Sequence, residues 1–169
     1  PFSGIFDGKG YNIANLYISN FGKSNLGLFG FTAAGSKIRN LDISDCKISG
    51  YENIGALVGF SNGIVNDCYS TGKIRGSSFI GGLVGVNNTN SNLSNCYSRC
   101  VINGIVSDLG GLVGKNYSGT VANCFWDMEI SGINTSAGGT PRCAYRRKNQ
   151  PGRGCFPPTR RMPAIQSAG

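Results

Sequence analysis

The sequence contains no histidine, and charged residues make up only 14% of its 169 positions. The lack of histidine removes the usual general base of nucleophilic catalysis. Together with the absence of any Cys-x-x-Cys pair, it also argues against a zinc site. No apolar run approaches about 18 residues, which excludes a membrane-spanning helix. The N-terminal stretch has neither a basic start nor an apolar segment, so no secretory signal is visible.

Basic charge and proline are scarce until the C-terminal end. Residues 1–140 hold nine Lys or Arg against eight Asp or Glu, whereas residues 141–169 hold seven Lys or Arg, no acid and five of the six prolines. The net charge of +8 is therefore mostly a property of the tail. We predict a folded domain over 1–140 and a disordered, basic Pro/Arg-rich tail over 141–169 that packs on nothing.

The folded part is rich in glycine, asparagine and serine, and it repeats itself. The stretches "IGALVGFSNGIVNDCYS", "IGGLVGVNNTNSNLSNCYS" and "LGGLVGKNYSGTVANCFW" are variants of one another. Self-alignment gives three apolar columns. The first is Leu16, Leu41, Cys68, Cys96 and Cys124; the second is Ile48, Ile74, Ile102 and Ile130; the third is Leu28, Leu57, Leu83 and Leu112.

A unit of roughly 25–29 residues with three short strands cannot bury its apolar face alone, but stacked units can, at one strand spacing of roughly 4.8 Å per coil. The density of Gly, Asn and Ser and the short β-branched runs contradict a helical repeat. We therefore predict an all-β protein, a parallel β-helix (solenoid) of about four to five coils.

One polar position precedes the first apolar column in every repeat. The spacing Ile38, Leu41, Ile43 breaks strict alternation, so the chain must bend near Asn40. Asparagine tolerates the left-handed backbone that such a bend requires. We predict a ladder of side-chain amides between coils, formed by Asn15, Asn40, Asn95 and Asn123, with Asp67 in the same column.

The quoted stretches resemble GLUG repeats. The opening "FSGIFDGKGYNIANLYI" is similar to the segment that leads into such arrays, and "CFWDMEISGINTSAGGT" is similar to their usual close. The resemblance covers about residues 2–140. It implies a large secreted or surface-attached bacterial or archaeal protein, such as an adhesin or the non-catalytic part of an immunoglobulin-A peptidase. The tail departs from the pattern, and a frameshift that replaced a Gly-x-x-Thr-Ala-Glu-like continuation is one hypothesis for its composition.

Three of the seven cysteines, Cys68, Cys96 and Cys124, share one column and are predicted to form an inward ladder of small buried thiols. Disulfides remain the alternative for this column. Cys46 and Cys100 share another column, two coils apart with Gly72 between them, which places them roughly 10 Å apart, too far to bond. We expect no metal and no cofactor.

The residues that follow the thiol column should point outward. They are mostly aromatic, and with the neighbouring Trp126 they form our candidate ligand contacts: Tyr17, Tyr69, Tyr97, Phe125 and Trp126. Aromatic faces in a row can stack on sugar rings or anchor a protein partner. Mutual stacking, or cover by a neighbouring domain, is the alternative explanation of the same column.

β-Helices also carry polysaccharide lyases and glycosidases, which need paired acids. The eight acids of this sequence do not gather in one place, so we identify no catalytic residue. We predict a non-catalytic extracellular or cell-surface scaffold of adhesin type, one section of a longer array that associates through its ends when made alone. Its partners would be a glycan, a surface protein or neighbouring domains of its parent. The alternatives are a fragment of a carbohydrate-active enzyme whose catalytic residues lie elsewhere, and a weak nucleic-acid binder acting through the tail.

Overall fold

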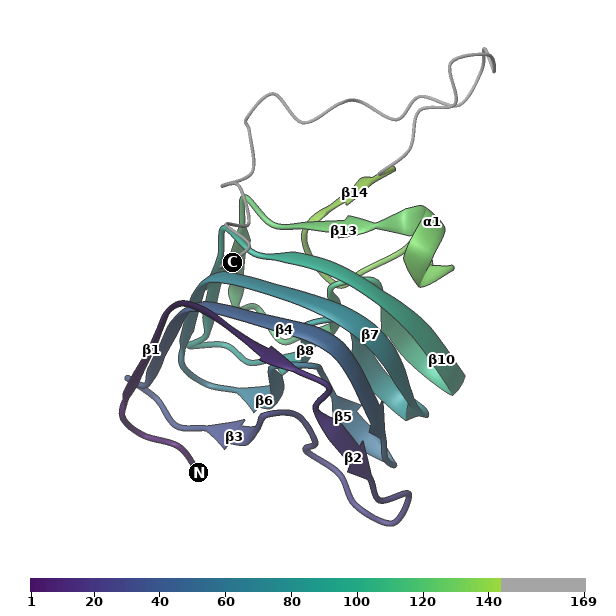
Figure 1. The fold of residues 1–169 in the computed structure, drawn as a ribbon, viewed down its shortest axis with the longest axis horizontal. Helices are drawn as coiled ribbons and strands as arrows, with labels where there is room; N and C mark the ends of the chain where they lie inside the picture. The colour runs from purple at the N-terminus through teal and green to yellow at the C-terminus, as the bar shows by residue number, and fades with distance from the viewer. Residues whose placement is uncertain (144–169) are drawn as a thin grey trace.

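A computed structural model describes residues 1–143, and these residues wind into a parallel β-solenoid (Figure 1). The predicted fold class is confirmed, with about four turns of the chain. Most of the predicted tail, residues 144–169, lies outside the described residues. Strand β14 is formed by Thr140–Arg142, so the sheet continues past the boundary predicted at residue 140.

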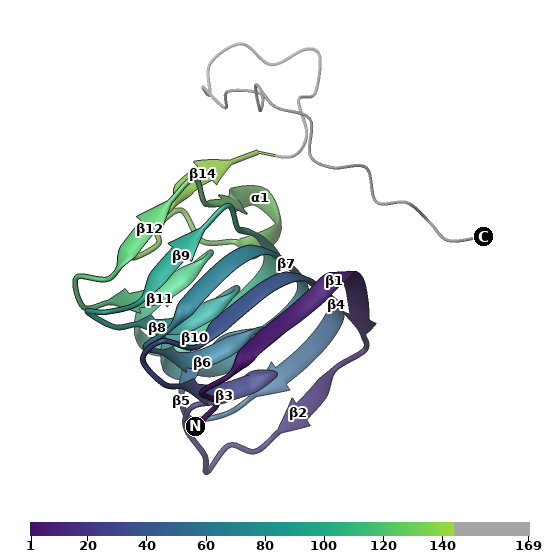
Figure 2. The same ribbon diagram turned by 90° about the vertical axis from the view of Figure 1, so that its left-hand side faces the viewer.

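The strands fall into two sheets, and every strand pair within them is parallel. The larger sheet runs in the order β1(Ile5–Ala14), β4(Lys37–Ser49), β7(Ile64–Gly81), β10(Tyr97–Gly110), β13(Phe125–Asp127) and β14(Thr140–Arg142), with β2(Tyr17–Ser19), β5(Glu52–Ile54), β9(Asn92–Ser94) and β12(Thr120–Ala122) paired beside it. The smaller sheet contains β3(Phe29–Thr32), β6(Val58–Ser61), β8(Val84–Asn87) and β11(Val113–Asn116). Figure 2 shows the strands of successive coils lying beside one another along the solenoid.

The third predicted apolar column stacks in full, and the second stacks over its first three members. Val58 pairs with Phe29 on one side and with Val84 on the other, and Val84 pairs with Val113, which aligns the preceding leucines Leu28, Leu57, Leu83 and Leu112. On the larger sheet, Ile74 pairs with both Ile48 and Ile102. The side chains of these columns fill the interior between the two sheets.

The predicted bend occurs at one left-handed residue in each coil. The φ angles of Asn40, Asp67, Asn95 and Asn123 are 52°, 51°, 53° and 52°. At Asn40 and Asp67 the bend lies inside a continuous strand, so β4 and β7 run for 13 and 18 residues. Asn95 lies between β9 and β10, and Asn123 lies between β12 and β13. The predicted three strands per coil are confirmed, as β4, β5 and β6 show, but the first strand of each coil is long rather than short.

A further column of bends was not predicted from the sequence. It lies where the larger sheet turns towards the smaller one, and its members have φ between 53° and 57°: Asn25, Asn53, Phe79 and Asp108. The register Ile54↔Ile80↔Leu109 aligns the residues that follow them. The recurrence of Asn and Asp at equivalent positions could have indicated these bends in the sequence, but Phe79 occupies the position in one coil and interrupts the pattern.

The first coil departs from the predicted register. Tyr11, not Leu16, lies opposite Leu41, and β1 contains an irregularity between Asp7 and Tyr11. Asn15 has a left-handed φ of 59°, but its backbone amide bonds the carbonyl of Ser44, so it belongs beside Asp45 rather than in the column of Asn40. The predicted positions of Asn15 and Leu16 are therefore wrong. The interval from Leu16 to Leu41 underestimates the length of this coil, which reaches back to Tyr11.

The last coil also differs. Ile130 does not continue the column of Ile102, because it lies in the short helix α1(Met128–Ser131) and is 40% exposed. The carboxylate of Asp127 caps this helix by accepting hydrogen bonds from the backbone N–H groups of Glu129 and Ile130, both at 3.0 Å. Gly132 ends the helix with a left-handed φ of 68°.

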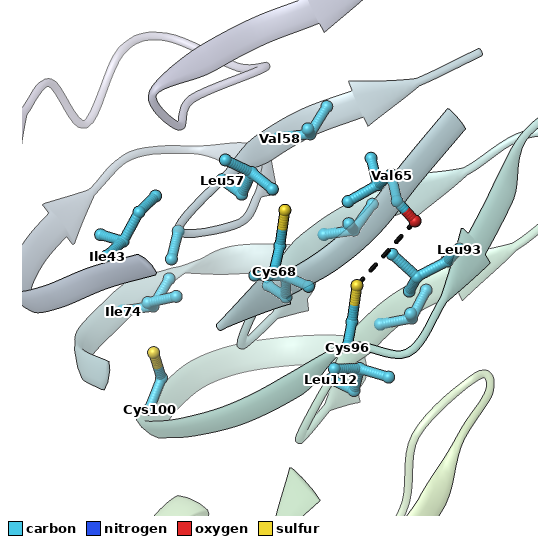
Figure 3. Close-up of a cluster of buried hydrophobic side chains, with 14 of the residues drawn as sticks. Ile43, Leu57, Val58, Val65, Cys68, Ile74, Leu93, Cys96, Cys100 and Leu112 are labelled. Carbon is cyan, nitrogen blue, oxygen red and sulfur yellow. Dashed lines mark hydrogen bonds between the residues drawn. The ribbon is translucent and has the colours of Figure 1, made fainter. Parts of the chain in front are cut away.

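Three buried thiols lie on adjacent coils where the first column was predicted. Figure 3 shows Cys68 and Cys96 projecting from neighbouring coils into the apolar interior. Cys68, Cys96 and Cys124 are at most 2% exposed, and all three are free thiols. Burial and the neighbouring thiols of Cys124 and Cys68 raise the pKa of Cys96 well above its usual value, so this side chain packs as a neutral thiol.

Candidate binding surfaces

Two of the predicted contact residues form a stacked pair on the outer face of the larger sheet. Tyr69 of β7 and Tyr97 of β10 are paired in register, with ring centroids 5.6 Å apart and an interplanar angle of 5°. Both rings are half-buried. Each ring therefore turns one face towards the other ring rather than towards solvent, which is the stacking alternative raised by the sequence.

The environment of this pair favours neutral phenols. Burial, and secondarily the charge of Asp127, raises the pKa of Tyr97 to about 12. Burial also raises the pKa of Tyr69, against a hydrogen bond from Arg99 that lowers it. Arg99 in turn forms an ion pair with Asp127, with Nε 3.3 Å from Oδ2. The carboxylate of Asp127 is fully buried, so it is held by both the helix N-terminus and this guanidinium.

Phe125 continues the column on β13, where its backbone pairs with Tyr97. Its ring is covered by the guanidinium of Arg142, whose Cζ lies 4.1 Å from the ring centroid. This cation–π contact covers one face of the ring, which is then not open to a sugar. The outer aromatic column thus consists of Tyr69, Tyr97 and Phe125, and much of its ring surface is used within the protein.

The structure separates the other two candidates from this column. Trp126 is only 3% exposed, and its indole Nε1 donates to the carbonyl of Ile133 at 3.0 Å. It packs inward against Gly111, because alternation along β13 turns Phe125 outward and its neighbour inward. Trp126 is therefore removed from the candidate contact residues. Tyr17 is 71% exposed, but it pairs with Lys47 rather than Asp42 and so lies on a different face.

The amide ladder is only partly formed as predicted. Asn123 donates to Asn95 at 3.4 Å, but Asn95 donates to Asn66 at 3.3 Å rather than to Asp67. Asn40 donates to Asp7 at 3.0 Å. A second contact of the same type joins Asn53 to Asn25 at 2.9 Å in the bend column that the sequence did not reveal. These side-chain contacts tie neighbouring coils together at their corners.

A second surface lies on the outer side of the sheet, where outward residues flank the inner Ile48 column up to the next corner. The outward side chains of its first column are Tyr17, Lys47, Lys73 and Val101, which are aligned by strand pairing. Beside it, at the next outward position of each strand, are Ser19, Ser49, Arg75 and Asn103. Two shallow hollows of about 260 and 350 Å³ lie at its edge, and both are lined by Arg75 and Ile105. We call these two columns and their edge the basic face.

The acidic residues of the described chain are used in structural contacts at several positions. Asp7 pairs with Arg39 at 3.0 Å, Asp108 pairs with Lys115 at 3.1 Å, and Asp127 holds Arg99 and the helix. Within residues 1–143, no group of three or more His, Cys, Asp or Glu side chains is arranged to hold a metal ion. None of the helices described is long and apolar enough to cross a membrane.

The fold and these surfaces define a parallel β-solenoid with repeated outward columns, and known proteins resemble it at two levels. Over 93 residues, or 55% of this chain, the sequence is 33% identical to halomucin of Haloquadratum walsbyi. The matched region spans only about 1% of the length of halomucin. No protein-family model matches the chain.

The fold itself occurs in a crystal structure of a Bacteroides ovatus protein that is provisionally assigned as an immunoglobulin A1 protease. The TM-score is 0.55, and the alignment covers 85% of this chain and 70% of that chain. Because the two sequences are only 19% identical, this likeness concerns the fold alone.

Proposed function

We propose that this chain is a non-catalytic repeat scaffold of a secreted or cell-surface protein, built from GLUG-type repeats and displaying binding surfaces in the manner of an adhesin. The observation that carries the proposal is the register of the coils. Because residues 41, 68, 96 and 124 and their neighbours occupy equivalent positions, every additional coil would repeat the same outward columns. A solenoid of this kind spaces and multiplies a surface at a fixed interval.

Three further observations support the proposal. The sequence likeness to halomucin links the repeats to a very large protein, of which this chain matches a small part. The acids Asp7, Asp108 and Asp127 are tied to cations or to a helix end rather than facing one another across a groove. The two hollows at the edge of the basic face are shallow and open, unlike the enclosed clefts that shelter catalysis.

The location can be tested by treating intact cells of the source organism with trypsin. We expect peptides from residues 1–143 to be released before those of a cytoplasmic marker protein, since a surface scaffold is accessible without lysis. Release of these peptides only after lysis would contradict the surface location.

The absence of catalysis can be tested with the full chain and a panel of acidic and neutral polysaccharides. We expect no new reducing ends and no unsaturated products. Product formation that is lost in Asp42→Asn/Asp45→Asn, the two acids of β4, would instead establish a carbohydrate-active enzyme. A glycan retained by the wild type but not by Tyr69→Ala/Tyr97→Ala would place the contact on the aromatic column, and the exposed tyrosines Tyr11 and Tyr117 supply the matched control pair.

A further inference from the structure

The basic face carries an arrangement of charge that folding alone does not favour. Lys47 of β4 and Lys73 of β7 are paired in register and both are exposed, so two ammonium groups project from neighbouring strands on the same side of the sheet. Like charges directly opposite one another weaken strand pairing. Arg75 projects from the same side at the next outward position after Lys73 and is also exposed.

These cations differ from several others on the described chain. Arg39, Arg99 and Lys115 form ion pairs with Asp7, Asp127 and Asp108. The outward positions of the two columns of the basic face contain no Asp or Glu at all. Instead, the guanidinium of Arg75 lies over the ring of Phe21, 5.8 Å from its centroid. The face is thus a row of cations without a carboxylate among them.

Exposed rings and small polar groups surround the cations. Tyr17 stands at the end of the lysine column and is 71% exposed, while Phe21 and Tyr51 at the corner are 57% and 51% exposed. The hollow of about 260 Å³ lies between Phe21, Tyr51, Arg75 and Ile105. In contrast to the stacked rings of Tyr69 and Tyr97, these rings leave about half or more of their surface open to solvent.

We propose that the basic face, centred on Lys47, Lys73 and Arg75, binds an acidic polysaccharide whose carboxylate or sulfate groups lie along the cations. The exposed rings of Tyr17 and Tyr51 stack on sugar rings, and the hydroxyl of Ser49 and the amide of Asn103 bond sugar hydroxyls. Binding relieves the repulsion between the paired lysines. This inference rests on the proposed function, because it identifies the ligand class of the displayed surface.

Charge complementarity selects an anion, and the remaining groups select a glycan over a nucleic acid. Nucleic-acid affinity arises mainly from phosphate contacts and falls steeply with salt. Sugar stacking on exposed aromatic rings adds an apolar contribution that salt does not screen. The open, shallow hollows accept a chain that lies along the surface rather than one that must enter a cleft.

The test compares two full-length double variants that lose the same charge. Lys73→Ser/Arg75→Ser removes two cations from the basic face, whereas Lys9→Asn/Lys37→Ser removes two exposed cations elsewhere. The asparagine at position 9 suits the left-handed φ of 52° there. Both variants keep the basic C-terminal segment, so any difference between them reports on the face. Retention is measured on immobilised heparin, on polygalacturonate and on neutral dextran, over a range of salt.

We expect the face variant to lose affinity for at least one acidic polymer by about tenfold or more, as for two charge-assisted contacts, and the control variant to lose less than about threefold. Tyr51→Ser should reduce the retention that persists at high salt. Unchanged melting temperatures establish that the variants are folded. Heparin and polygalacturonate separate sulfate from carboxylate recognition.

Equal losses in the two double variants would overturn the proposal, because the binding would then follow net charge or the C-terminal segment. Displacement of the polysaccharide by a single-stranded oligonucleotide at lower concentration than by free glycan would also overturn it in favour of a nucleic acid. Neither result would bear on the proposed scaffold role. That role would be contradicted instead by product formation from a polysaccharide or by a cytoplasmic location.

Discussion

The corners of the solenoid can be tested at Asn53, where two stabilising contributions can be separated. The residue has a left-handed φ of 55°, and its side-chain amide donates to Asn25 Oδ1 at 2.9 Å across neighbouring coils. Asn53→Gly keeps the backbone conformation but removes the hydrogen bond. It should lower the free energy of unfolding by about 1–2 kcal/mol, from the bond and from the added freedom of the unfolded chain.

Asn53→Ala removes the same hydrogen bond and also forces a Cβ-bearing residue without a compensating side chain into the left-handed region, at a cost of about 1–2 kcal/mol. The alanine variant should therefore lose roughly 2–3 kcal/mol and be about 1 kcal/mol less stable than the glycine variant. For a chain of this length, each kcal/mol corresponds to roughly 2–4 °C in Tm.

The measurement is urea unfolding followed by circular dichroism, with linear extrapolation to water. Asn92→Ala serves as the control, because Asn92 is an exposed strand residue outside the left-handed positions, and its cost should stay within about 0.5 kcal/mol. If alanine at position 53 proves as stable as glycine, the backbone conformation does not contribute, and our account of the corners is refuted.

Three other perturbations test the interior and the aromatic column. Cys96→Arg should prevent folding, because an unpaired charge among buried thiols costs several kcal/mol, whereas Cys96→Ala should remain folded by circular dichroism. Gly72→Ala should lower the free energy of unfolding in urea by at least about 2 kcal/mol, because the alanine Cβ would collide with the carbonyl oxygen of Cys46 and because the φ of Gly72 is 141°. A loss below about 0.5 kcal/mol would contradict this packing. The pKa of Tyr97 is raised to about 12 in the folded protein from an unfolded value near 10, so its contribution to stability is complete below pH 10 and is lost as the pH rises to 12. Tyr97→Phe should abolish that part of the pH dependence of unfolding. An alkaline stability profile identical to that of the wild type would refute this assignment.

Much of the fold could be predicted because equivalent residues recur in successive coils at a nearly constant interval. The spacing from Leu28 to Leu57 and the shared glycines located the smaller sheet, and Cys68, Cys96 and Cys124 located the larger one. The first coil could not be placed by the Asn-Leu pair at 15–16, since the interval from Leu16 to Leu41 is shorter than the interval from Leu28 to Leu57. Two columns that cross the same coil must be separated from their next members by nearly the same number of residues. A comparison of the two intervals would therefore have shown that Leu16 is misplaced.

The candidate surface was harder to predict than the fold. Repeat spacing identifies which residues point outward, but it does not show that Tyr69 and Tyr97 use their faces on each other, or that Arg142 covers Phe125. For Trp126, alternation after the outward Phe125 already predicts an inward side chain. Only the structure shows that Gly111 leaves room for the indole. Repeat spacing is enough to place Lys47 and Lys73 in one column, but it does not bring Arg75 and the exposed ring of Phe21 beside them, which the structure does.

The corner beside the basic face also tolerates a change in chain length. The pairing of β7 with β10 shifts by one residue between Gly104 and Ser107, so the later coil carries an extra residue at Ile105–Val106, yet Leu109 and Ile80 are again in register beyond it. Ile105 and Val106 are 78% and 67% exposed, so the added residue is accommodated outside the packed interior. The chain can thus change in length at this corner while the strand register on either side of it is kept. The architecture therefore allows ligand preference to diversify coil by coil along a single molecule while the interior stays constant.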